Sequence, residues 1–177
     1  MTGDFSNAEL WFERGEAERD AGNFRQAELL FAKAVELAPA NGGYLAELAL
    51  AMDENGKTED ALRILQRACE VAPLIDSVWC ARGVTLFKAG DSNAAIFCFE
   101  RAARLNPHEV LNWTNLALAF GALREYKKAL SAFEQACEIT PEDADLWMKK
   151  ARVLEVLGET ERAAHCRASA ERLSSYL

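Results

Sequence analysis

The apolar residues of this chain fall into ten blocks, and within each block they recur three or four positions apart. That spacing is typical of amphipathic helices and predicts ten of them, grouped in pairs. Four prolines separate the pairs at a fixed interval of 34 residues, at Pro39, Pro73, Pro107 and Pro141. Because proline does not fit the interior of a helix, the four prolines mark equivalent helix ends. The interval therefore predicts an internal repeat.

With each proline at the thirty-second place of a 34-residue repeat, the chain divides into five repeats without an insertion. We expect an N-terminal cap segment, in which Ser6 and Glu9 have the spacing of a capping box, and then one repeat domain. In the fifth repeat Arg167 replaces a large apolar residue, which favours a capping role for a terminal repeat that faces solvent. The cap segment is 1–7, and the domain, 8–177, contains repeats 8–41, 42–75, 76–109, 110–143 and 144–177.

Several places in the repeat hold the same kind of residue every time. The eighth place is always glycine or alanine, and alanine occupies the twentieth and twenty-seventh places in all five repeats. Such small residues let two helices approach closely, and the larger residues beside them fill the remaining space. A helical hairpin of this size does not bury its own apolar face, so neighbouring repeats must stack. All four tryptophans fall at the fourth place, where we expect them to pack in the core: Trp11, Trp79, Trp113 and Trp147.

Glycine recurs where each pair of apolar blocks is divided, which predicts a left-handed residue at the end of each first helix. These glycines are Gly22, Gly56, Gly90 and Gly158, whereas the fourth repeat has Arg124 at this place. Polar residues follow, and we expect them to cap the second helices: Asn23, Thr58, Asp91 and Thr160.

The fourth repeat carries Trp113, Leu116-Ala117, Phe120, Ala129, Phe133, Ala136 and Pro141 in order. This pattern resembles the tetratricopeptide repeat, and the resemblance covers nearly the whole chain. It implies an all-α fold, a right-handed superhelical solenoid of five helix-turn-helix repeats with ten helices. It also implies a concave groove, lined by the first helix of each repeat, that binds peptides or partner proteins.

The chain has 177 residues and a net charge of −8, which argues against nucleic acid as a partner. The first 75 residues, with 14 acidic and 7 basic side chains, hold most of this negative charge, so they would attract a basic partner segment. No apolar run reaches the ~20 residues of a membrane-spanning helix, and the first residues lack the pattern of a signal peptide. We expect a cytoplasmic protein without a membrane partner.

The residues that could carry chemistry do not form an enzyme signature. His108 and His165 lack an adjacent nucleophile or a pattern of metal ligands, so we expect two solvent-facing side chains. The five cysteines include no C-x-x-C pair, and we expect no metal or cofactor. Four of them occupy helix-packing places, and only Cys80 is expected to face the groove; the four are Cys69, Cys98, Cys137 and Cys166.

The groove is therefore the candidate site. It should be acidic near the N-terminal end, apolar around Val84, Phe87 and Leu118, and mildly basic at its far end. A protein or peptide segment with a basic end and an apolar anchor would be complementary, although a charged helix face can also be merely solvated. The predicted groove residues are Phe12, Glu13, Glu16, Glu47, Leu50, Cys80, Val84, Phe87, Thr114, Asn115, Leu118, Met148, Lys149 and Arg152.

Two functions follow from this pattern. The first is a non-catalytic scaffold that holds a partner segment in the groove. The alternative is a structural module that associates with itself into homo-oligomers. For the alternative, Leu29 and Phe97 supply apolar side chains at an outer place of the repeat that is otherwise polar.

Overall fold

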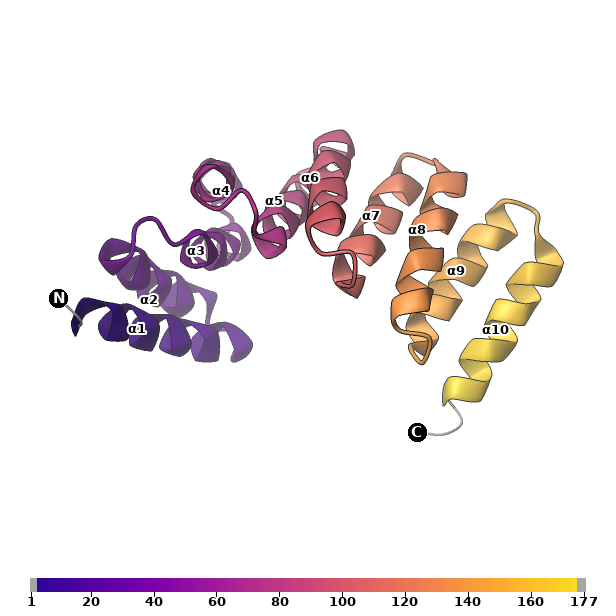
Figure 1. Ribbon diagram of the computed structural model, residues 1–177, viewed down its shortest axis with the longest axis horizontal. Helices are drawn as coiled ribbons and strands as arrows, with labels where there is room; N and C mark the ends of the chain where they lie inside the picture. The colour runs from indigo at the N-terminus through magenta and orange to yellow at the C-terminus, as the bar shows by residue number, and fades with distance from the viewer. Residues whose placement is uncertain (1–2, 175–177) are drawn as a thin grey trace. The chain divides into compact units, whose positions relative to one another are not determined.

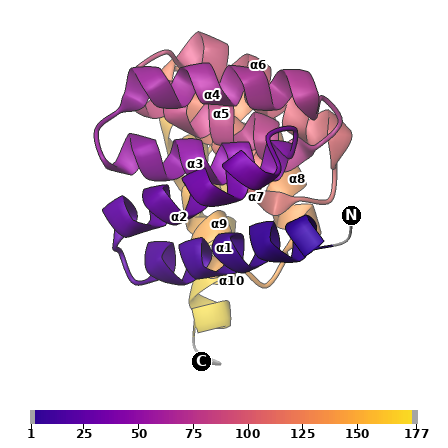
Figure 2. The same cartoon turned by 90° about the vertical axis from the view of Figure 1, so that its left-hand side faces the viewer.

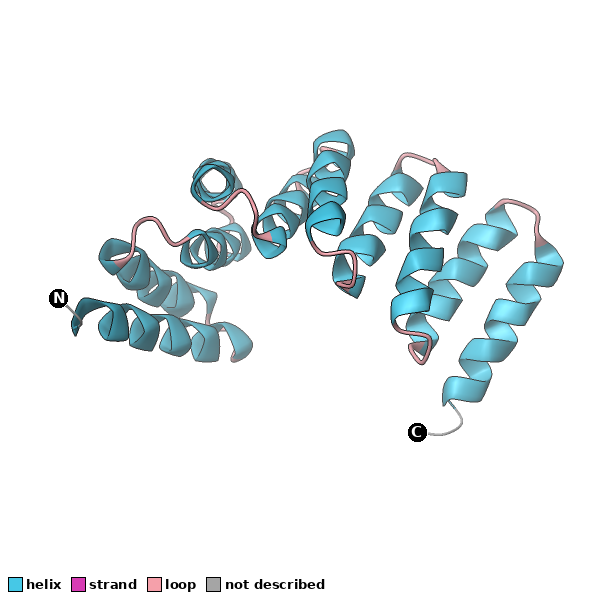
Figure 3. Cartoon of the chain, viewed as in Figure 1, coloured by secondary structure: helices cyan, strands magenta, loops and turns pink. Residues whose placement is uncertain are grey.

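The structure is a computed structural model that describes residues 3–174. Within that range the chain forms ten helices and no strand (Figure 3), so the prediction of an all-α fold of five helical pairs is confirmed. The helices are α1 (Gly3–Asp20), α2 (Phe24–Leu37), α3 (Gly42–Glu54), α4 (Thr58–Val71), α5 (Asp76–Lys88), α6 (Ser92–Leu105), α7 (Val110–Ala122), α8 (Tyr126–Ile139), α9 (Ala144–Val156) and α10 (Thr160–Ser174). None of these helices combines the length and apolarity that crossing a membrane requires.

The chain forms two compact units, and each is described by itself. Unit 1 is Met1–Asp91 and contains α1 to α5, whereas unit 2 is Ser92–Leu177 and contains α6 to α10. In unit 1 each helix packs on the next one along the chain, and α3 also contacts α5 (Figure 2). In unit 2 the same order holds from α6 to α10 (Figure 1).

The alanine columns form the centre of the packing, as predicted. The alanines at the twentieth place, from Ala27 to Ala163, are all completely buried. Those at the twenty-seventh place, from Ala34 to Ala170, are at most 3% exposed. The large side chains Phe31, Leu65, Phe99 and Phe133 fill the space beside them and are also buried. Close helix crossings therefore set the spacing within and between the repeats.

Gly15 shows how close one of these crossings is. A Cβ atom added at this glycine would lie 2.6 Å from two ring carbons of Phe31, which is far inside van der Waals contact. Phe31 is completely buried and has no room to withdraw. Because Gly15 has no side chain, the backbone of α1 can lie directly against the Phe31 ring of α2.

The turn within each repeat has a left-handed residue, also as predicted. The four turn glycines have φ between 77° and 88°. Arg124 occupies the same place in the fourth repeat and adopts φ 58°, a conformation that costs a residue with a Cβ about 1–2 kcal/mol. The residue after each of the five donates its N–H to a carbonyl five positions back, for example Asn23 to Glu18 at 2.8 Å. This backbone bond closes the end of the first helix.

Two of the predicted caps of the second helices, Asn23 and Thr58, are wrong. Asn23 precedes α2 but makes no capping bond, and its side-chain amide donates to Glu18 instead. Thr58 lies inside α4 and donates its hydroxyl to Asp53 at 2.7 Å. In both cases the side chain reaches back to the preceding helix, because the tight left-handed turn brings that helix end within reach.

The first helix also begins earlier than predicted. α1 starts at Gly3, so Ser6 already lies within the helix and not before it. No proline or glycine follows Gly3 within the segment before Ser6, and nothing in the sequence there prevents the helix from extending toward the N-terminus.

Candidate functional site

Ion pairs connect the first helices of unit 1. Arg19 on α1 pairs with Glu47 on α3, and Lys88 on α5 pairs with Glu54 and Asp53 at the end of α3, the latter at 3.5 Å. The Asp53 side chain is only 5% exposed and also accepts the Thr58 hydroxyl bond. Several carboxylates of the predicted acidic surface are therefore neutralised within the chain.

Part of α1 keeps exposed negative charge. Glu16 lies 3.9 Å from Arg19, whereas Glu9 and Glu13 form no ion pair within the described part of the chain. Both residues are exposed. Glu9 and Glu13 thus retain the acidic character predicted from the sequence. Further along the first helices, Arg19 is shared by three carboxylates and Lys88 by two.

The predicted apolar groove residues of unit 1 are half-buried. The ring of Phe12 stacks on Tyr44 with 4.5 Å between centroids and lies 5.4 Å from Phe31. Leu50 packs against the core cluster around Leu65. Val84 and Phe87, both on α5, keep part of their surface accessible. These side chains contribute to packing first and offer only a fraction of their area to a partner.

Two predicted groove residues are buried. The Cys80 side chain is 7% exposed, so the expectation that this cysteine faces an open groove is wrong. Thr114 is 9% exposed, and its hydroxyl donates to the Val110 carbonyl at 2.9 Å. A small side chain on a first helix is covered by its larger neighbours, which the place in the repeat alone does not reveal.

The remaining predicted residues lie on α7 and α9 in unit 2. Leu118 and Met148 are each 41% exposed, and Leu111 on α7 is 54% exposed. The polar predicted residues are also accessible, with Asn115 and Lys149 half-buried and Arg152 exposed. Because Val84 and Phe87 belong to unit 1 and Leu118 to unit 2, the apolar surface that they were expected to form together stays a prediction.

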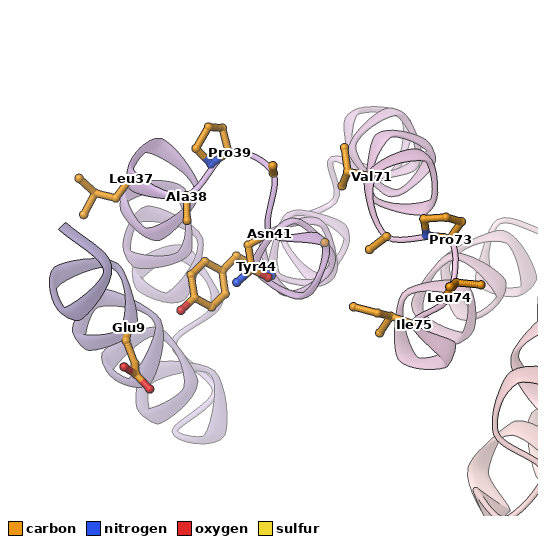
Figure 4. Close-up of a pocket in the computed structure, with 13 residues that line it drawn as sticks. Glu9, Leu37, Ala38, Pro39, Asn41, Tyr44, Val71, Pro73, Leu74 and Ile75 are labelled. Atoms are coloured by element: carbon orange, nitrogen blue, oxygen red, sulfur yellow. The ribbon is translucent and has the colours of Figure 1, made fainter. Parts of the chain in front are cut away.

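A pocket in unit 1 was not predicted. It has a volume of about 930 Å³ and lies between the two loops 38–41 and 72–75 that connect the first three repeats. Glu9 of α1, Tyr44 of α3, and the apolar side chains of Leu37, Val71, Leu74 and Ile75 line it. Figure 4 shows Tyr44 extending from α3 toward α1 and Ile75 extending from the start of α5 toward α3. We call it the loop pocket.

Tyr44 joins the apolar and acidic sides of the loop pocket. Burial raises the pKa of its hydroxyl, and the charges of Glu9 and Glu13 raise this pKa further. The hydroxyl therefore stays protonated at neutral pH and can donate a hydrogen bond. At the same place of the later repeats, Val78, Asn112 and Leu146 are all buried.

The residues before α5 depart from the other repeats. Asn41, Glu109 and Asp143 occupy the last place of their repeats, and each accepts a hydrogen bond from the first turn of the next helix. Ile75 occupies this place in the second repeat and makes no such bond. A missing cap typically costs about 1 kcal/mol. The preceding residue, Leu74, is 76% exposed, where the third and fourth repeats have histidine and glutamate.

Trp79, Trp113 and Trp147 pack against the core, as expected, and also have a polar role that was not predicted. All three donate an indole N–H to the carbonyl of the proline six residues earlier. The donors are Trp79, Trp113 and Trp147, at distances of 3.0, 2.9 and 2.7 Å. At the first junction, where Leu45 has no donor, Arg67 of α4 donates to the Pro39 carbonyl at 2.8 Å.

The histidine and cysteine side chains are the remaining groups that could carry chemistry. Both histidines are exposed, as predicted. All five cysteines are free and buried, which confirms the packing role of the four that were assigned one. Burial raises the pKa of Cys69 and Cys166, and it raises that of Cys137 to about 11. The residues that the structure describes contain no group of three or more potential ligands that could hold a metal ion.

Comparison with known proteins identifies the family. Three segments match tetratricopeptide-repeat profiles: residues 8–41, 77–109 and 110–153, which together span more than half of the chain. The chain belongs to the tetratricopeptide repeat family, a class of repeat proteins typical of protein-interaction scaffolds. No curated protein matches the chain significantly in sequence.

Solved structures share the fold at low sequence identity. A crystal structure of MamA is 22% identical, covers 92% of this chain and 95% of its own, and has a TM-score of 0.80. PilF of Pseudomonas aeruginosa is 18% identical, covers 97% and 78%, and has a TM-score of 0.88. A MamA fragment from Desulfovibrio magneticus RS-1 is 16% identical, covers 99% and 98%, and has a TM-score of 0.82. At these identities the likeness concerns the fold.

Proposed function

We propose that the chain is a non-catalytic scaffold of the cytoplasm that holds a segment of a partner protein against the first helices of its repeats. The observation that carries this proposal is the set of apolar side chains that α7 and α9 leave exposed, namely Leu111, Leu118 and Met148. All three occupy first-helix places that line the groove in this family. Exposed apolar side chains that lie on one surface typically mark a contact with another molecule.

The partner segment should carry an apolar anchor and a basic end. The anchor would cover the exposed leucine and methionine side chains of unit 2. Separately, the negative charge of Glu9 and Glu13 in unit 1 favours basic residues in the partner. Neither nucleic acid nor a membrane offers this combination, because both present a negatively charged surface to the protein.

Affinity capture from the native cell extract tests the scaffold function. The double variant Leu118→Glu/Met148→Glu should lose the captured partner, since both side chains are already exposed and a charge there leaves the core intact. The matched control is Ser131→Glu/His165→Glu on α8 and α10, which adds the same two charges at exposed outer places and should retain the partner. Equal capture by the double variant and the wild type would exclude contact through the first helices.

Self-association is the second candidate function. Leu29 on α2 is 61% exposed and Phe97 on α6 is 57% exposed, although both lie at an outer place that is otherwise polar. A second copy could cover these side chains. Light scattering at increasing concentration should then show a mass above that of one chain, and Leu29→Gln/Phe97→Gln should return the mass to that of a monomer. A single-chain mass at every concentration excludes this function.

A further inference from the structure

We infer that the loop pocket of unit 1 is the anchor site for a partner segment that carries a bulky apolar side chain next to a lysine or arginine. This inference rests on the proposed scaffold function. It assigns the main contact to the edge formed by the loops 38–41 and 72–75, which belongs to no predicted part of the groove.

The first argument is that the chain departs from its own repeat at this pocket. Ile75 occupies a place where the three other junctions have a capping side chain, and it leaves 43% of its surface exposed. Leu74 beside it is 76% exposed, and the repeat does not require an apolar residue there. The missing cap costs stability, and the exposed Leu74 costs solubility. Local rules are typically broken in this way at functional sites.

The second argument is the shape and composition of the pocket. Its volume of about 930 Å³ falls in the range of about 300–1,000 Å³ that is usual for ligand sites, enough for a short stretch of peptide. Val71 and Leu37, which are 41% and 40% exposed, extend the apolar lining beyond Leu74 and Ile75. A pocket with this lining favours leucine, isoleucine or phenylalanine over a polar side chain.

Tyr44 gives the pocket a polar group at a defined position. The ring of Phe12 stacks on the ring of Tyr44, and this contact orients the Tyr44 side chain before a partner binds. Its protonated hydroxyl can donate a hydrogen bond to a backbone carbonyl of the bound segment. The partner can thus be held by its backbone as well as by its apolar side chain.

Charge specifies the second feature of the partner. Glu9 lines the pocket, and its charge and that of Glu13 both act on the Tyr44 hydroxyl, so the two carboxylates lie on this side of unit 1. Other acidic residues of the first helices are paired with Arg19 or Lys88 within the chain. Glu9 at the pocket and Glu13 near it form no ion pair among the residues that the structure describes, so their negative charge attracts a basic neighbour of the apolar anchor and repels an acidic one.

A random library of twelve-residue peptides, selected on the full-length chain, tests this inference. The enriched sequences should combine leucine, isoleucine or phenylalanine with lysine or arginine. One enriched peptide is then synthesised, and its Kd is measured for the wild type and for variants. Ile75→Ser should weaken binding about tenfold, because an apolar contact is lost. Serine can also supply the missing cap of α5, so the variant should keep the melting temperature of the wild type.

The charge is tested separately. Glu9→Gln/Glu13→Gln should raise the Kd about threefold and make it less sensitive to salt. The matched charge control is Glu59→Gln/Asp60→Asn on α4, which removes two exposed negative charges away from the pocket and should leave the Kd unchanged. The matched apolar control is Leu29→Ser, which removes an exposed leucine from the outer face of unit 1.

The outcomes distinguish the two proposals. If peptides are enriched but bind Ile75→Ser as tightly as the wild type, the pocket assignment is wrong while the scaffold function stands. Enriched peptides without basic residues, or a wild-type dimer that Ile75→Ser dissociates, also overturn the assignment. If the chain enriches no peptide, binding of short segments is itself wrong. Loss of binding in Ile75→Ser, with both controls unchanged, supports the pocket.

Discussion

The first junction between repeats differs from the three that follow it. At the later junctions a tryptophan fills the space between neighbouring helices and donates its N–H to the carbonyl of the preceding proline, as in Trp113 to Pro107. At the first junction Leu45 fills the space, and Arg67 of another helix donates to Pro39. The carbonyl is satisfied in all four cases. The repeat therefore conserves the hydrogen bond at the loop rather than the residue that makes it.

Substitutions in the alanine columns should destabilise the chain equally at both kinds of junction. Ala34 precedes the first junction and Ala102 precedes a tryptophan junction, and both are completely buried. Ala34→Leu and Ala102→Leu should each lower the free energy of unfolding by about 3 kcal/mol, because an added isobutyl group forces the helices apart. Urea denaturation measures this effect. An unchanged stability in either variant would contradict the close packing at that crossing.

Substitution of a junction tryptophan should show how the later junctions differ from the first one. Trp113→Leu makes a later junction resemble the first one, but no arginine is placed there to replace the lost donor. We expect a loss of about 2 kcal/mol from the ring contacts and the hydrogen bond together. Trp113→Phe keeps an aromatic ring and should lose only about 1 kcal/mol. If Trp113→Phe unfolds at the same urea concentration as the wild type, the indole N–H contributes nothing.

The second junction differs from its neighbours because no side chain caps the helix that follows it. Asp143→Ala removes bonds to the N–H groups of Asp145 and Leu146 and should destabilise the chain by about 1 kcal/mol. Ile75→Ala removes no cap and only part of a half-exposed side chain, so its thermal unfolding should change less. A larger loss for Ile75→Ala would show that Ile75 has a structural role and would weaken the case for the loop pocket.

The smallest effect is expected at the first junction itself. Arg67→Met removes the donor to the Pro39 carbonyl but keeps most of the aliphatic stem. Arg67 is exposed, so water can replace the lost donor, and we expect a change of about 0.5 kcal/mol or less. A loss as large as that of Trp113→Leu would mean that the two junctions depend equally on this bond.

Most of the fold could be predicted from the sequence, because it depends on residue size at fixed intervals. The helical pairs, the alanine crossings and the left-handed turns at Gly22, Gly56, Gly90 and Gly158 all follow from the 34-residue period. The capping errors at Asn23 and Thr58 have another cause. A polar residue after a turn can bond forward or backward, and the choice depends on the tight backbone geometry that only the structure shows.

The candidate site was harder to predict, because accessibility depends on neighbours from other helices. Cys80 and Thr114 occupy first-helix places but are covered by adjacent side chains. Glu47 pairs with Arg19, which lies 28 residues away in sequence. The loop pocket did leave a signal in the sequence. Ile75 and Leu74 are apolar where the later repeats are polar, and a comparison of the loop places would have shown this.

The buried thiols have a consequence for how the chain can be followed in solution. A covered thiol reacts slowly with alkylating reagents, so its reaction requires the surrounding helices to open. Repeats 2 to 5 contain Cys69, Cys80 and Cys98, Cys137, and Cys166, whereas the first repeat contains none. The chain thus carries a built-in set of opening reporters, from which mass spectrometry could read the local opening of each later repeat.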